Sequence, residues 1–165
     1  MSHERYKNCV LLFTVLGLSI GMNQDIARAL DSGAVERGRY LVQIAGCNDC
    51  HTPRYGELGG EIPDALWLTG DTFGWRGPWG TTYATNLRTL MQNFTEDQWV
   101  SFAKDLKTRP PMPWFNLNVM TKADLRAIYQ FIRHLGPGGQ PAPPYLAPNL
   151  EPDPPFAQFP SPPSQ

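Results

Sequence analysis

The residues of this chain best suited to chemistry are the pentapeptide Cys47-Asn48-Asp49-Cys50-His51. Two thiols at this spacing can each form a thioether with one vinyl group on the same edge of a porphyrin, which makes Cys-x-x-Cys-His the attachment pattern for c-type haem. The histidine that follows the second cysteine can bind the iron from the proximal side. The pattern therefore predicts one haem c, bound covalently through Cys47 and Cys50 with His51 as an axial ligand.

Two other uses of paired cysteines are a structural zinc site and a redox centre. A structural zinc ion usually takes four ligands, commonly from two such pairs, and the chain offers in addition Cys9, His3 and His134. A thioredoxin-like centre needs a βαβ context, which this proline-rich and glycine-rich sequence does not show. Haem attachment is therefore the favoured interpretation.

The opposite side of the iron needs a second ligand, and two methionines are candidates. Met112 lies in Pro110-Pro111-Met112-Pro113-Trp114, where the prolines stiffen the backbone that must hold a weak iron–thioether bond. Met120 directly precedes a predicted helix cap, a position typical of a packing contact with its own helix. Met112 is favoured and Met120 stays open. His134 is a weaker candidate, because cationic histidines are common at helix ends.

Residues 1–29 have the pattern of a secretory signal peptide. Arg5 and Lys7 precede an apolar run from Val10 to Met22, and Ala27-Arg28-Ala29 matches a cleavage site. The alternative is an uncleaved anchor, but this run is shorter than the roughly 20 residues that a membrane-spanning helix needs. We therefore expect export to the periplasm, where haem is attached to such chains, and no stable membrane span.

Three segments have helical patterns. The first runs from Asp31 to Ala45, where Gly38 is either a close helix crossing or an ordinary helix glycine. The second begins after a capping box at Thr95 and ends before Arg109. The third is capped by Thr121, ends at Gly136-Pro137 and carries a single apolar stripe. The stripe consists of Leu125, Ile128, Tyr129, Ile132 and Leu135.

The segment from Thr52 to Asn86 is rich in glycine and aromatic residues and shows no sustained period. A long irregular loop in a compact domain usually has a function, and we expect this one to wrap around the haem with at most short helical or strand pieces. Trp79, Tyr83, Asn86 and Arg88 are candidates to bind the haem propionates, which need polar partners where they are buried. The candidates for apolar packing on the porphyrin are Leu66, Trp67, Leu68, Phe73, Trp75, Trp79 and Tyr83.

Residues 137–165 contain 11 prolines among 29 residues. This composition predicts an extended tail that is solvated and mostly disordered. The alternative is a strap that lies along the domain or a partner, with contacts at Tyr145, Leu146, Phe156 and Phe159.

Residues 31–136 resemble the class I c-type cytochromes. The resemblance rests on a helix that leads into Cys47-x-x-Cys50-His51, a methionine among prolines, and a capped last helix. It is strongest to single-haem cytochromes and to cytochrome subunits of bacterial periplasmic dehydrogenases. It implies a cytochrome c domain over residues 30–136, an all-α fold in which the first and last helices cross, and iron ligation by His51 and Met112.

The function that follows is an exported one-electron carrier, not an enzyme, because ligation by histidine and methionine leaves no open iron position for a substrate. Its partners would be redox proteins, a dehydrogenase or a terminal oxidase. The chain has 14 basic and 15 acidic residues, a balance that gives no footprint for nucleic acid. The alternatives are a subunit bound permanently to a periplasmic dehydrogenase and a five-coordinate haem enzyme or sensor.

Overall fold

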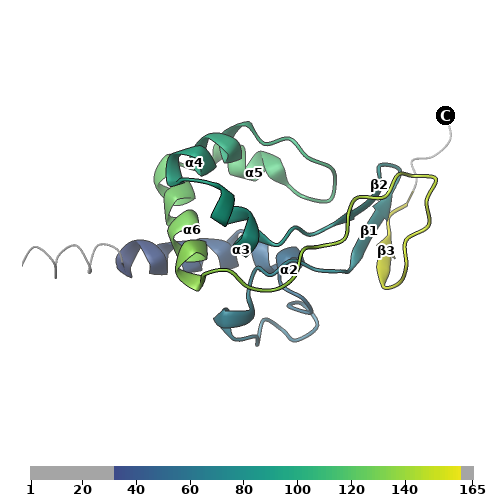
Figure 1. The fold of residues 1–165 in the computed structure, drawn as a ribbon, viewed down its shortest axis with the longest axis horizontal. Helices are drawn as coiled ribbons and strands as arrows, with labels where there is room; N and C mark the ends of the chain where they lie inside the picture. Colours follow the sequence, from purple (N-terminus) through teal and green to yellow (C-terminus); the bar gives the residue numbers. More distant parts are fainter. Residues whose placement is uncertain (1–31, 161–165) are drawn as a thin grey trace, which may run out of the picture. The chain divides into compact units, whose positions relative to one another are not determined.

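The computed structural model describes residues 32–160, so the expected signal peptide, with Cys9 and His3, lies outside the described residues. Residues 32–44 are helical. They are followed by α2 (Cys47–His51), α3 (Leu87–Leu90), α4 (Glu96–Asp105), α5 (Trp114–Val119) and α6 (Lys122–Leu135), with 3-10 turns at Asp64–Leu66 and Met91–Asn93 (Figure 1). In this part of the chain no helix combines the length and apolarity that crossing a membrane requires.

The caps predicted for the last two long helices are confirmed. Thr95 accepts from the Gln98 backbone N–H, and the Gln98 side chain accepts in return from the Thr95 N–H, so α4 begins with a complete capping box. Thr121 accepts from the Asp124 N–H at the start of α6, and Gly136 ends that helix at φ 70°. The apolar stripe of α6 is buried in the core around Leu125, Ile128, Phe131 and Ile132.

The first helix crosses α6 at Gly38. A Cβ at this position would lie 2.0 Å from the carbonyl oxygen of Ala127 and 2.7 Å from the Cβ of Phe131. Real side chains do not approach so closely, so the two backbones can meet here because Gly38 has no side chain. The crossing role for this glycine is confirmed, and Val42, four residues further along the same helix, is fully buried.

The expectation of an all-α fold is wrong. β1 (Gly74–Gly77) and β2 (Gly80–Tyr83) form an antiparallel hairpin, and β3 (Phe156–Gln158) pairs in parallel with β1 to give the order β2-β1-β3. The strands are three or four residues long, too short for an alternating pattern to stand out, although Trp75 and Tyr83 are typical strand residues. The loop expected over residues 52–86 therefore contains two of the three strands of a small mixed sheet.

The strap, which we define as residues 137–160, is not a solvated tail, and that expectation is wrong. It leaves α6 and runs back to the hairpin (Figure 1). Leu146 and Thr81 exchange two backbone hydrogen bonds of 2.8 and 3.0 Å. The Phe159 ring lies 5.2 Å from that of Trp79. Because β3 is an edge strand, the prolines beside it cost no ladder bond in the sheet interior.

The start of the strap is fixed by the buried Arg88 side chain. Its guanidinium donates to the carbonyls of Gly136 (2.7 Å), Ala65 (2.5 Å) and Leu135. Carbonyls at a helix C-terminus carry partial negative charge, so a cation stabilises the end of α6. Burial lowers the pKa of Arg88, but a guanidinium keeps its charge at any physiological pH.

Arg88→Met is expected to lower the free energy of unfolding by roughly 3 kcal/mol, because it removes the charged donor that the carbonyls of Ala65, Leu135 and Gly136 share. Urea denaturation of the haem-loaded protein measures the loss. Arg126, which pairs with Glu96 and Asp97 at the surface, provides the control, since Arg126→Met should cost at most about 1 kcal/mol. Equal losses in the two variants would contradict a special role for Arg88.

Candidate functional site

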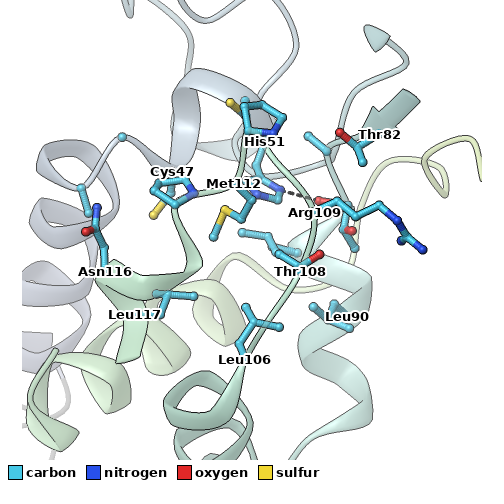
Figure 2. Close-up of a pocket in the computed structure, with 18 of the residues that line it drawn as sticks. Cys47, His51, Thr82, Leu90, Leu106, Thr108, Arg109, Met112, Asn116 and Leu117 are labelled. Atoms are coloured by element: carbon cyan, nitrogen blue, oxygen red, sulfur yellow. Dashed lines mark hydrogen bonds between the residues drawn. The ribbon is translucent and has the colours of Figure 1, made fainter. Parts of the chain in front are cut away.

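A cavity of about 440 Å³ opens beside α2, within the size range of cofactor sites. Cys47, Cys50, His51, Met112 and Met120 all line it, together with many apolar side chains. Figure 2 shows His51 and Met112 reaching into this space from different segments of the chain. The structure therefore brings together the two cysteines, the histidine and both methionines that the sequence singled out.

The short helix that carries the pentapeptide is held by local contacts. Gly46 precedes it with φ 69°, a left-handed conformation that favours glycine. Inside the molecule, the Thr52 hydroxyl donates to the side-chain oxygen of Asn48 (2.8 Å) and accepts from the backbone N–H of Leu68 (2.8 Å). Asn48 and Thr52 are both buried. Asn48, one of the two residues between the cysteines, is thus anchored, and Cys47 and Cys50 lie at the cavity wall.

The His51 imidazole is oriented by one hydrogen bond. Its Nδ1 lies 2.7 Å from the carbonyl oxygen of Thr85. A carbonyl can only accept, so Nδ1 carries the hydrogen and Nε2 keeps a free lone pair. Burial lowers the pKa of His51, although the bond to Thr85 acts in the opposite direction. The ring is thereby kept neutral and in the tautomer that a metal ligand requires.

The environment of the two cysteines differs from that of a redox pair. They form no disulfide with each other. Burial raises the pKa of Cys47 to about 11 and also raises that of Cys50, whereas redox-active pairs depend on a lowered thiol pKa. Among residues 32–160, no group of three or more histidine, cysteine and acidic side chains could hold a metal ion. The raised thiol pKa values therefore do not match the redox interpretation.

The two methionines are held in different ways. Met112 lies between Pro111 and Pro113, ahead of α5, and both prolines also line the cavity. Met120 directly follows α5, and its backbone carbonyl accepts from the Lys104 ammonium group, which also binds the carbonyl of Asn118 (3.0 Å). Both side chains are partly buried against the core. The contacts of Met120 are those of a junction between two helices, while Met112 belongs to an irregular segment over the cavity.

The residues predicted to bind the propionates lie in different places. Tyr83 lines the cavity. Trp79 is not among the residues that line the cavity and packs on Phe159. Asn86 caps α3, and its side-chain amide donates to the carbonyls of Gly138 (2.8 Å) and Gln140 (3.1 Å). Arg88 is used at the end of α6, as described above. Of these side chains, Tyr83 is the one that the cavity brings next to the cysteines and histidine.

Several residues at the cavity carry no signal in the sequence. Thr85 acts through its backbone carbonyl, which any residue type could supply. Leu117 lies on α5, a helix that the sequence did not predict although a proline precedes it, as is common at helix starts. Arg109 lines the cavity beside Tyr145, which the sequence named as a possible contact of the strap but not of the cavity, and the two are 36 positions apart. Residues that meet through long-range folding leave no local pattern to read.

The cavity fits a haem on the character of its donors. It combines two thiols at thioether spacing, an imidazole with a free Nε2 and thioether sulfurs within largely apolar walls. The indole N–H of Trp75, which also lines the cavity, is buried and has no hydrogen-bond partner within the described part of the chain. Such a donor suits a propionate, because a buried N–H without a partner is costly.

Comparison with known proteins identifies relatives at moderate identity. The cytochrome c subunit of alcohol dehydrogenase (quinone) from Gluconacetobacter polyoxogenes is 31% identical over 125 residues, which cover 67% of this chain and 24% of the relative. The same subunit from Komagataeibacter europaeus gives the same values, and that from Gluconobacter oxydans (strain 621H) is 28% identical over 137 residues, 74% of this chain and 26% of the relative. The chain thus spans about a quarter of the length of these relatives.

No family model and no solved structure matches the chain. The similarity to the three relatives covers two thirds or more of its length. The resemblance read from the sequence is therefore confirmed, and the chain is similar to the cytochrome c subunits of bacterial dehydrogenases.

Proposed function

We propose that this protein is an exported c-type cytochrome with a single haem that carries one electron at a time between redox proteins. The observation that carries the proposal is the cavity in which Cys47, Cys50, His51 and Met112 meet. The names of the relatives support the electron-transfer role.

Each side chain has a defined task in this proposal. Cys47 and Cys50 would hold the haem through thioethers, and the Nε2 of His51 and the sulfur of Met112 would bind its iron. When bound, the haem supplies an iron that changes between the ferric and ferrous states. The protein contributes ligand orientation, through the Thr85 carbonyl behind His51, and apolar burial. With His51 and Met112 both bound to the iron, the site would move electrons and leave no position for a substrate.

The relatives favour a dehydrogenase as partner. Each is named as a subunit of a quinone alcohol dehydrogenase, so we propose that this chain receives electrons from a dehydrogenase and passes them to another redox protein, such as a terminal oxidase. It acts either as a free carrier or as a subunit of the dehydrogenase complex. Purification from the native host by haem absorbance separates the two forms, since a bound subunit co-elutes with alcohol-oxidising activity and a carrier does not.

Covalent attachment gives the first test of the site. In Cys50→Ala, haem staining after denaturing electrophoresis should fall sharply, because one of the two thioether bonds cannot form. Asp49→Ala, which changes the exposed residue between the cysteines, should retain the stain. Extraction of all haem from the wild-type protein by acidified acetone would contradict covalent attachment.

A further inference from the structure

The strap meets the segment that carries Met112 through a pair of side chains. The guanidinium carbon of Arg109 lies 3.7 Å from the centre of the Tyr145 ring, the shortest cation–π contact in the described residues. Arg109 stands three positions before Met112, and Tyr145 belongs to the strap. The Tyr145 hydroxyl also donates to the carbonyl oxygen of Trp79 (2.9 Å) in the hairpin turn. Both Arg109 and Tyr145 line the cavity.

The β1–β2 hairpin contacts both the Met112 segment and the strap, next to the Arg109–Tyr145 pair. The Thr82 hydroxyl donates to the Pro110 carbonyl (2.8 Å), so β2 binds the Met112 segment directly. The neighbouring Thr81 is paired with Leu146 of the strap. At the turn, a Cβ on Gly80 would lie 2.3 Å from the Leu146 carbonyl oxygen, so strap and hairpin approach as closely as their backbones allow. The strap, the hairpin and the Met112 segment thus hold one another at the cavity.

We propose that Tyr145 is a positioning residue for the methionine ligand, and that the strap clamps the Met112 segment closed over the cavity through Arg109. The inference rests on the proposed function, in which Met112 binds the iron. An iron–thioether bond is weak, so a ligand from solution can replace it whenever the segment opens. The clamp lowers the population of the open state and thereby keeps external ligands from the iron.

The test is a titration of the oxidised, haem-loaded protein with imidazole. Binding is measured by the loss of the far-red charge-transfer band that iron–methionine coordination produces. The side chains of Arg109 and Tyr145 are both exposed, and an exposed cation–π contact accounts for roughly a two- to fivefold change in such an equilibrium. Tyr145→Leu should therefore bind imidazole roughly two- to fivefold more tightly than the wild type, and more quickly. Tyr145→Phe keeps the ring under Arg109 and loses the bond to Trp79, so its affinity should lie between the two.

Tyr129 offers a matched control. Arg133 lies over its ring at 5.9 Å, and its hydroxyl donates to the carbonyl of Phe94 (2.9 Å), but it does not line the cavity. Tyr129→Leu should lower thermal stability and leave imidazole binding unchanged. Arg109→Gln removes the other half of the clamp and should repeat the effect of Tyr145→Leu, so the test survives if one variant does not fold.

The outcomes separate the two levels of the proposal. Wild-type imidazole affinity in Tyr145→Leu or in Arg109→Gln would overturn the clamp, and so would an equal increase in Tyr129→Leu. In those cases the methionine band of the wild-type protein would still support ligation of the iron by Met112. A wild-type protein without that band would overturn the ligation itself.

Discussion

Replacing Met112 with alanine is expected to abolish the iron–methionine charge-transfer band of the oxidised protein, lower its midpoint potential and open the iron to carbon monoxide. The thioether stabilises the reduced state relative to other ligand sets, so its loss moves the potential downward. Removal of a side chain from the cavity wall also leaves space for an external ligand. Absorption spectroscopy, a redox titration and carbon monoxide binding to the reduced protein measure the three effects.

Met120→Ala is the matched control, because Met120 lines the same cavity. We expect it to retain the methionine band and the potential, and to lower the free energy of unfolding by roughly 2 kcal/mol through lost packing. Its backbone stays fixed by Lys104 whatever the side chain is. If Met120→Ala loses the band and Met112→Ala keeps it, the two methionines have to exchange roles.

Gly38→Ala is expected to destabilise the protein by roughly 3 kcal/mol or more, at the upper end of the cost of overpacking. The added Cβ would meet the backbone carbonyl of Ala127 at 2.0 Å, and a helix backbone cannot turn away as a flexible side chain can. The two helices must separate, which loosens the core around Val42 and Phe131. Urea denaturation, followed by tryptophan fluorescence, measures the loss.

Gly56→Ala is the control for Gly38→Ala. Gly56 lies in the loop after the pentapeptide, where a Cβ would meet nothing within 4 Å, so the change should stay within about 0.5 kcal/mol. If the two alanine variants unfold at the same urea concentration, the first helix and α6 do not cross at the distance that the structure gives.

The parts of the fold that the sequence predicts are those with local causes. The caps at Thr95 and Thr121 are each made by residues three positions apart, and the glycine that ends α6 acts on its own backbone. The pentapeptide is local in the same sense. The sheet is different, because β3 pairs with β1 across about eighty positions and each strand is too short to show a period. Its pairing depends on where the strap is carried by the rest of the fold.

Asn86 illustrates how a local signal competes with a functional one. Its side chain was expected to bind a propionate, and that role stays a prediction. In the structure its oxygen accepts from the Thr89 N–H at the start of α3. Asparagine is among the best residues at this capping position, so the start of α3 after Asn86 could have been predicted from the sequence. The carbonyl of Thr85, one residue earlier, offered no such signal, since its role at His51 does not depend on residue type.

The position of the strap in the sequence has a consequence for the order of assembly. A chain made from its N-terminus releases Cys47, Cys50 and His51 first, then the Met112 segment, and the residues that clamp that segment last. Contacts across so long a separation form late in folding, because the intervening chain must first be ordered. In a chain that is exported from its N-terminus, the cavity therefore stays accessible until Tyr145 and β3 have arrived. Under the proposed function, a haem would have this interval to reach the cysteines before the strap closes over it.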